Sequence, residues 1–328
     1  ALRKSINIPM VKVMEALTIP KARKYISKFY SINESAVPPY LSTALGTISV
    51  TPLQAAKAYA VLGHGGVDVF PLVVTRIEDR DGKVLRNYEK EVFDKYKSTN
   101  PDALKVVSPQ AAYLVNSILQ GVAKPGGTAV SLASYNFPFE FAGKTGTTSN
   151  WKDAWFNGYT SNMATVIWIG FDRTSSLGRG FTGGVIAAPI WGKFMNFVHK
   201  VLKVAIPPFS KPDNLVWANI DAFTGYLAGP GSQRTLMEVF IAGTQPKMVS
   251  DGKHIFSLVM PENPIATFTP AETEENTINP FSNVQQTTTT DNPFSIFDTI
   301  FQGDTGNTDD SGGSDSTDST DNSNSNGD

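Results

Sequence analysis

Apolar and polar positions in the first 250 residues follow helical and strand periods in turn. Thr51-Pro52 forms an N-cap and first-turn pair, which predicts a helix over Leu53–Leu62 that ends in a glycine cluster. Ser108-Pro109 repeats this signal ahead of a second helix. A later helix is predicted to bury one apolar stripe, formed by Ile190, Phe194, Phe197, Val198 and Val201.

Strand periodicity dominates the chain between the last two of these helices. Three strands are predicted there, over Glu140–Thr148, Asp153–Thr160 and Thr165–Phe171. Because only short turns join them, neighbouring strands should pair antiparallel. Asp81-Gly82 predicts a separate hairpin between Val73–Ile77 and Lys83–Leu85. The predicted fold class is therefore α+β, an antiparallel sheet flanked by helices.

Composition changes twice along the chain and suggests three regions. Pro207-Pro208 interrupts the helical pattern and leads into a small β-rich piece. Residues 303–328 contain only Gly, Asp, Asn, Ser and Thr, so they offer no apolar surface to offset the entropy of ordering. We expect a main domain over residues 1–206, a β-rich extension over 207–250 and a disordered acidic tail over 251–328.

Basic and acidic residues are also distributed unevenly between these regions. The net charge of the 328 residues is −2. All 28 basic residues lie within residues 1–253 with 17 of the 30 acidic ones, which gives that part +11. Residues 254–328 carry the other 13 acidic residues. The near-neutral total hides a basic domain and an acidic tail.

Several kinds of site are excluded by residue content. The chain has no cysteine, so it has neither a disulfide framework nor a cysteine-ligated metal. Its three histidines are far apart in sequence, and no metal or cofactor site is predicted. The longest apolar run, Met163–Phe171, is shorter than the roughly 20 residues that a membrane span needs. No nucleic-acid partner is expected.

The sequence Lys144-Thr145-Gly146-Thr147 is the first candidate for chemistry. A phosphate-binding loop would need a glycine at position 138, which is proline, and would open a helix where a strand continues. On an edge strand, Lys144 and Gly146 would share one face and the two threonines the other. A lysine and hydroxyl groups at such an edge suit an anion such as a carboxylate. The alternative is an ordinary exposed strand that carries a lysine.

Serine motifs are less informative by themselves. Ser5-Ile6-Asn7 could simply place a helix-capping serine before a helix over Pro9–Leu17. The nucleophile pattern Ser-x-x-Lys occurs at Ser149…Lys152 and at Ser250…Lys253. A lysine activates a serine when both lie on one helical turn, and neither site has a helical pattern. We interpret both as chance matches.

Taken together, ordered blocks over residues 1–247 resemble the transpeptidase domain of class A (bifunctional) penicillin-binding proteins. The main blocks are Ser5-Ile6-Asn7, Val50–Ala56, Gly143–Thr148, Asp153–Phe156, Trp168–Gly170 and Ala188–Trp191. Asp221…Gly225 and Phe240–Thr244 resemble the C-terminal extension of this family. Any one block is weak, but eight in the order of the family form a specific signal.

The resemblance implies a serine acyl transfer that cross-links peptidoglycan stem peptides and that β-lactams block. Ser5 would relay protons between two lysines and the leaving amine, and Asn7 would hold the donor backbone. Lys144 would complete the proton network. Thr145 and Thr147 would bind the terminal carboxylate, across Gly146, and the Thr147 amide would serve the oxyanion hole.

One part of the family pattern is missing from the 328 residues. The nucleophilic Ser-x-x-Lys precedes Ser-x-Asn in this family, whereas here only four residues precede Ser5. We therefore expect a fragment that is inactive alone. Its partners would be stem peptides, β-lactams and its own N-terminal portion, which would carry a glycosyltransferase domain and a membrane anchor. The site would act outside the cytoplasmic membrane. An inert binding module, a D,D-carboxypeptidase and a β-lactamase remain alternatives.

Overall fold

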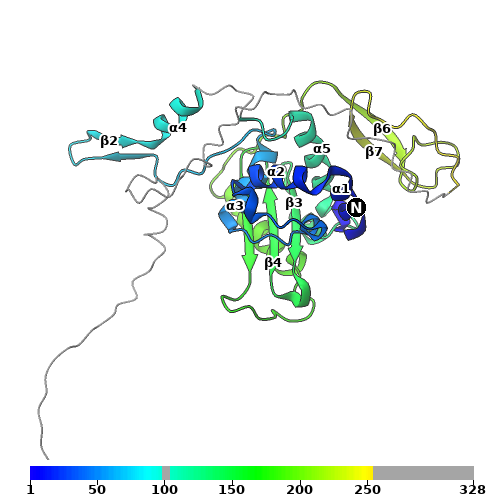
Figure 1. Ribbon diagram of the computed structural model, residues 1–328, viewed down its shortest axis with the longest axis horizontal. Helices are drawn as coiled ribbons and strands as arrows, with labels where there is room; N and C mark the ends of the chain where they lie inside the picture. Colours follow the sequence, from blue (N-terminus) through cyan, green and yellow to red (C-terminus); the bar gives the residue numbers. More distant parts are fainter. Residues whose placement is uncertain (98–103, 254–328) are drawn as a thin grey trace, which may run out of the picture. The chain divides into compact units, whose positions relative to one another are not determined.

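A computed structural model describes residues 1–97 and 104–253 of the chain (Figure 1). The tail predicted over residues 251–328 therefore lies almost wholly outside the described residues. In the described ranges, none of the helices combines the length and the apolar character that crossing a membrane requires.

The central element is a three-stranded antiparallel sheet in the order β3-β4-β5. Its strands are β3 (Ala142–Thr147), β4 (Ala154–Tyr159) and β5 (Ala164–Ile169). Cross-strand pairs run from Ala142 opposite Tyr159 to Thr147 opposite Ala154. The predicted strands and their antiparallel pairing are confirmed, with ends that differ by one or two residues from those that the sequence pattern indicates. Strand β3 lies at one edge of this sheet.

The described residues also form helices. The longer ones are α1 (Asn7–Leu17), α2 (Ile19–Tyr30), α3 (Pro52–Gly63), α4 (Tyr88–Lys97), α5 (Pro109–Leu119) and α6 (Ala188–Lys200). Short helical turns are η1 (Leu2–Lys4), η2 (Glu34–Ala36), η3 (Leu41–Leu45), η5 (Gln120–Ala123), η6 (Val130–Tyr135), η7 (Ser149–Trp151) and η8 (Gly183–Ala187). The predicted start of α3 is confirmed, because the Thr51 hydroxyl accepts from the Gln54 N–H and the Gln54 side chain accepts from the Thr51 N–H.

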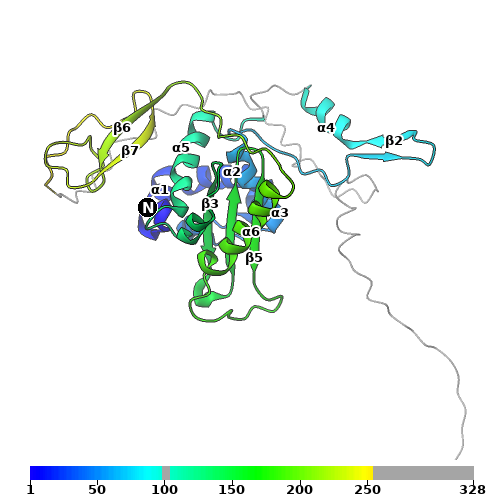
Figure 2. The ribbon, with the colours of Figure 1, turned by 180° about the vertical axis from the view of Figure 1, so that it is seen from behind.

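Each face of the sheet has its own core. On one face Ala142 and Tyr159 pack with Leu119 of α5 and with Phe209. On the other face Phe156 packs with Trp191 and Met195 of α6. Helices α1 to α3 lie in front of the sheet in Figure 1, and α6 lies in front of it when the chain is viewed from behind in Figure 2. The sheet lies between helices on its two faces, which confirms the prediction of an antiparallel sheet flanked by helices.

The prediction of which apolar stripe of α6 is buried is wrong. The buried residues of α6 are Ala188, Trp191, Gly192, Met195 and Val198. Of the predicted stripe only Val198 is buried, whereas Ile190 and Phe194 are 46% and 41% exposed. The two stripes are one residue apart, and both contain large apolar side chains. Packing at Gly158 selects the stripe that contains Trp191, because the glycine has no side chain and the Trp191 indole occupies that space.

Two hairpins stand apart from the central sheet. The first joins β1 (Arg76–Glu78) and β2 (Val84–Asn87) and confirms the turn predicted at Asp81-Gly82. The Asp79 carboxylate accepts from the N–H groups of Asp81 and Lys83, and Gly82 has a positive φ. The second hairpin joins β6 (Leu215–Asp221) and β7 (Thr235–Ile241).

A buried carboxylate organises the second hairpin. Asp221 ends β6, and its Oδ2 accepts the Ser250 hydroxyl at 2.7 Å. Its Oδ1 accepts the Phe223 N–H at 2.8 Å. These hydrogen bonds, that of Ser250 first, lower the pKa of Asp221 to about 2. The last described residues are thereby tied to the end of β6.

Helix α6 offers a test of its observed orientation. Met195→Ala should lower the free energy of unfolding by about 2–5 kcal/mol, because it opens a cavity in the core. Phe194→Ala, on the adjacent exposed position, should cost less than about 1 kcal/mol. Urea unfolding of the two variants distinguishes the two stripes. A larger loss for Phe194→Ala would mean that α6 is turned by about one residue.

The Asp221 carboxylate should make the extension sensitive to acid. Because its pKa is lower in the folded state, it stabilises the extension above its ordinary pKa near 4, and this stabilisation is lost as the pH falls toward about 2. Ser250→Ala removes the main cause of the low pKa, so the acid transition should move to higher pH. The fluorescence of Trp217, which lies on β6, reports this transition. An unchanged midpoint would contradict the assignment.

Candidate active site

The Lys144–Thr147 sequence lies on edge strand β3, as predicted. Lys144 and Gly146 share the face of Ala142, which belongs to the core beneath α5. Gly146 fits closely against β4, because a Cβ there would lie 3.0 Å from the Trp155 side chain, which would have to shift. The strand continues through the motif rather than opening a helix, so the phosphate-loop interpretation is excluded by structure as well as by sequence.

Ser5 meets Lys144 across 139 positions of sequence. The Lys144 Nζ donates to the Ser5 Oγ at 2.5 Å and to the Thr145 carbonyl oxygen at 2.7 Å. Ser5 follows η1 in a left-handed conformation with φ of 53°. Ile6, not Ser5, is the N-cap of α1, so the interpretation of Ser5 as a capping residue is wrong. The hydroxyl is directed at the lysine instead.

The position of Lys144 changes its acidity. Burial lowers the pKa of the Lys144 ammonium from 10.5 to about 8. The physical cause is desolvation, which disfavours the charged form. A lysine with such a pKa exchanges its proton near neutral pH, and the Ser5 hydroxyl is placed to receive it.

The two threonines lie on the opposite face from Lys144. Thr145 is only 9% exposed, and its Oγ1 is 2.7 Å from the Thr128 Oγ1. Thr147 is exposed, and its Oγ1 accepts the Gly183 N–H at 3.1 Å. The Thr147 hydroxyl therefore keeps its own proton for donation. Of the two, Thr147 is the more accessible to a ligand.

The backbone of β3 adds a donor at the open edge. The Thr148 N–H bonds the Asp153 carbonyl, so it points toward β4. In an antiparallel strand, successive residues alternate in direction, which turns the Thr147 N–H away from β4. The Thr147 N–H thus lies at the open edge of the strand that carries Lys144, and the hydroxyl of the same residue is exposed.

Two polar residues that were not singled out as candidates support the motif. Asn157 pairs with Lys144 across β3 and β4, and its side chain is buried. Asp153 accepts from the Thr148 hydroxyl and from the Trp168 indole N–H, each at 3.0 Å, and so fixes the turn after β3. A polar residue in the middle of an apolar strand was the signal available for Asn157.

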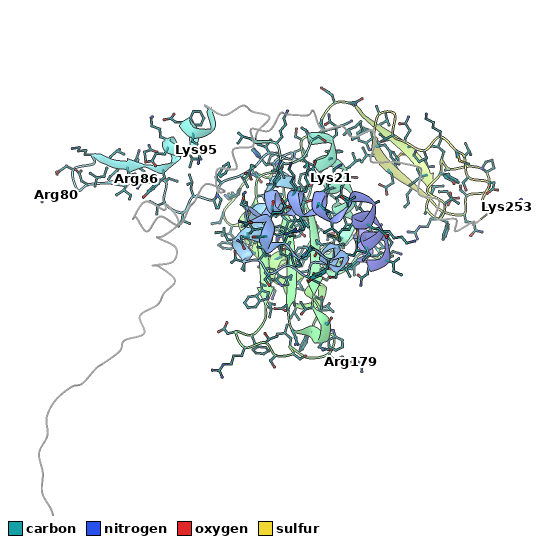
Figure 3. The ribbon with its side chains drawn as sticks, in the orientation of Figure 1. Lys21, Arg80, Arg86, Lys95, Arg179 and Lys253 are labelled. Carbon is teal, nitrogen blue, oxygen red and sulfur yellow. The ribbon has the colours of Figure 1, made fainter. Side chains whose placement is uncertain are left out.

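The end of the sheet is further held by a loop that precedes η8. The Leu177 N–H donates to the Trp151 carbonyl at 2.7 Å, and the Ser176 hydroxyl donates to the Asn150 carbonyl at 2.8 Å. Arg179 of this loop is exposed and extends from this end of the sheet in Figure 3. The loop therefore fixes the turn that follows the candidate site.

The remaining candidates are placed as follows. Asn7 is the exposed first residue of α1, two residues after Ser5. Ser149 begins a turn in which Asn150 and Trp151 both have positive φ, which is not the helical setting that a Ser-x-x-Lys pair needs. Ser250 is bound to Asp221. Both Ser-x-x-Lys matches are thus accounted for by local structure.

The geometry combines a proton-exchanging pair with an anion-binding edge. Ser5 and Lys144 can pass a proton, and Thr147 offers two donors to a negatively charged oxygen. A nucleophile that attacked a carbonyl group at this edge would find both functions within one site.

Comparison with known proteins identifies the family of the chain. A family profile described as "Penicillin binding protein transpeptidase domain" matches residues 1–196. A second, described as "Penicillin-binding protein 1A, C-terminal domain", matches residues 211–254. The resemblance drawn from the sequence blocks is confirmed, including the extension.

Relatives and a solved structure carry the same name. Penicillin-binding protein 1A of Pseudomonas aeruginosa is 33% identical over 290 residues, which are 76% of this chain and 35% of that protein. Penicillin-binding protein 1A of Neisseria gonorrhoeae is 37% identical over 200 residues, 61% of this chain and 24% of that protein. The crystal structure of Penicillin-Binding Protein 1A from Haemophilus influenzae superposes with a TM-score of 0.64 at 30% identity, over 76% of this chain and 40% of that one.

The chain spans only 24% to 35% of the length of these two curated relatives. The profile match nevertheless includes every residue of the candidate site, from Ser5 to Thr147. Since that single match accounts for more than half of the 328 residues, the chain belongs to the penicillin-binding protein transpeptidase family.

Proposed function

We propose that the chain forms the Ser-x-Asn and Lys-Thr-Gly-Thr parts of the active site of a peptidoglycan D,D-transpeptidase. The observation that carries the proposal is the hydrogen bond from Lys144 to Ser5, which joins the two motifs. Thr147, with an exposed hydroxyl and an outward N–H, supports a role in binding the donor. The family membership supports the reaction class.

In the proposed mechanism a serine outside the 328 residues passes its proton to the lysine of its own Ser-x-x-Lys motif and attacks the carbonyl carbon between two D-alanines. The tetrahedral oxyanion is held by the Thr147 N–H together with a second donor near the nucleophile. The peptide C–N bond then breaks, and the departing amine takes a proton that Lys144 supplies through Ser5. An amine of a second stem peptide resolves the acyl-enzyme and forms the cross-link. A β-lactam acylates the same serine.

The remaining residues take roles consistent with their positions. Asn7 holds the donor backbone, and the Thr145 and Thr147 hydroxyls bind the terminal carboxylate across Gly146. We assign residues 1–206 to the transpeptidase domain and residues 207–250 to the C-terminal extension. The site acts outside the cytoplasmic membrane, in a longer protein whose N-terminal portion provides the nucleophile and the membrane anchor. By itself the chain is inactive.

The proposal is tested with the protein expressed from its whole gene and a fluorescent penicillin. Covalent labelling that disappears when the serine of an upstream Ser-x-x-Lys is changed supports it. No labelling, with non-covalent binding of a stem peptide, would favour an inert binding module. Release of the acyl group to water rather than to an amine would favour a D,D-carboxypeptidase or a β-lactamase.

Lys144 should be required for acylation. Lys144→Ala removes the proton donor of Ser5, and the rate of labelling should fall by about 100-fold or more. The matched control is Lys152→Ala, in the exposed turn after β3, which should label at the rate of the unchanged protein. Comparable losses in both variants would contradict a specific role for Lys144.

The lowered pKa of Lys144 predicts a pH limit. With a pKa of about 8, Lys144 is mostly protonated at pH 7 and loses its proton as the pH rises. If the proton reaches the departing nitrogen through Ser5, the acylation rate should decline above about pH 8. Lys144→Arg keeps the charge to much higher pH, so the decline should move upward in the labelling that remains. A decline that stays near pH 8 in Lys144→Arg would assign it to another group.

A further inference from the structure

The residues of the candidate site come from two segments that are far apart in sequence. Ser5 lies on the segment between η1 and α1, and Lys144 and Thr145 lie on β3. A single hydrogen bond between flexible side chains does not fix two segments in register. One loop, residues 121–128, contacts both of them.

At one end the loop holds Arg3 of η1. The Arg3 Nη2 donates to the Pro125 carbonyl oxygen. Gly121 accommodates the stem of the arginine, because a Cβ at this position would lie 2.7 Å from the Arg3 Cδ. Ser5 follows Arg3 by two residues, so this contact limits where the Ser5 hydroxyl can lie.

At the other end the loop holds Thr145 of β3. The Thr128 and Thr145 hydroxyl oxygens are 2.7 Å apart. A Cβ on Gly184 would clash with the Thr128 carbonyl oxygen, so η8 lies directly over this contact. If Thr128 donates, the proton of the Thr145 hydroxyl remains available to an anionic ligand at the sheet edge.

Between its two ends the loop is internally bonded and anchored. The Gly127 N–H donates to the Lys124 carbonyl at 2.8 Å, and the Ala129 N–H donates to the Val122 carbonyl at 3.0 Å. Val122 and Ala129 are each 1% exposed, in the core that contains Trp191. A displacement at either end must therefore disturb this core.

We propose that residues 121–128 are the positioning segment of the site, which sets Ser5 against Lys144 through Arg3 and directs the Thr145 hydroxyl through Thr128. This inference rests on the proposed transpeptidase function. Arg3 and Thr128 are positioning residues, since each acts through a neighbour. Arg3 should affect the proton transfer, and Thr128 should affect binding of the carboxylate.

The test separates these two effects in the protein expressed from its whole gene. Acylation by a fluorescent penicillin is measured over a range of concentrations, which gives a limiting rate and a half-saturating concentration. Arg3→Met should lower the limiting rate by about tenfold, with the half-saturating concentration little changed. Thr128→Val should raise the half-saturating concentration by about tenfold, and Thr128→Ser, which keeps the hydroxyl, should restore it.

Matched controls exclude a general loss of structure. Arg23→Met removes an arginine that also donates to backbone carbonyls, those of Val37 and Glu34, in another part of the chain. Thr160→Val removes a buried threonine hydroxyl just beyond the far end of β4. Both controls should leave the two constants within about twofold of the unchanged protein.

A third variant acts on the loop as a whole. A Cβ at Gly127 would clash with the carbonyl oxygens of Val122 and Gly121, so Gly127→Ala should change both constants together. Should it fail to fold, Gly121→Ala, which presses only on the arginine stem, should change the limiting rate alone. If the unchanged protein is labelled but Arg3→Met and Thr128→Val behave like their controls, the positioning inference is wrong. If the unchanged protein is not labelled at all, the proposed function itself fails.

Discussion

A lysine whose ammonium group is largely withdrawn from water determines much of the local structure around β3. Desolvation lowers the pKa of Lys144 to about 8, and the charged form is tolerated because Ser5 and the Thr145 carbonyl accept its protons. Moving Ser5 away would leave the Thr145 carbonyl as the remaining one of these two acceptors for a largely desolvated ammonium group. The hydrogen bond from Lys144 to Ser5 stabilises the segment that follows η1 beside β3, and the contacts of residues 121–128 with Arg3 and Thr145 add to the coupling between the beginning of the chain and its central sheet.

Glycines and small residues make that coupling possible. Gly158 admits the indole of Trp191 on the α6 face of the sheet, and Gly121 admits the stem of Arg3 near Ser5. In each of these close approaches, a neighbouring group occupies the space that a side chain at the glycine would otherwise fill. The contacts that hold α6 against the sheet and Arg3 near Ser5 therefore depend on residues that lack a side chain.

The sequence predicts the sheet and most of the helix starts because these depend on local signals. Thr51-Pro52 and Ser108-Pro109 specify their helices through caps, and short turns determine the antiparallel order. The orientation of α6 could not be predicted, since two apolar stripes compete and tertiary packing at Gly158 selects one. The pairing of Ser5 with Lys144 could be expected only from family resemblance. The contact between Thr128 and Thr145 joins residues whose side chains give no periodic signal.

The hydrogen bond between Ser250 and Asp221 extends the folded structure to residues that composition assigns to the boundary of the tail. Composition changes gradually after position 250, but the Ser250 hydroxyl completes the hydrogen bonds of a carboxylate that begins to be organised 29 residues earlier. Gly252 in turn donates its N–H to the Ser250 hydroxyl. A shortened version of the protein that stopped before Ser250 would remove the hydroxyl that bonds the buried Asp221 Oδ2, and would leave the N–H groups of Phe223 and Thr224 on Oδ1. One that stopped after Lys253 would leave the extension with all of its described hydrogen bonds.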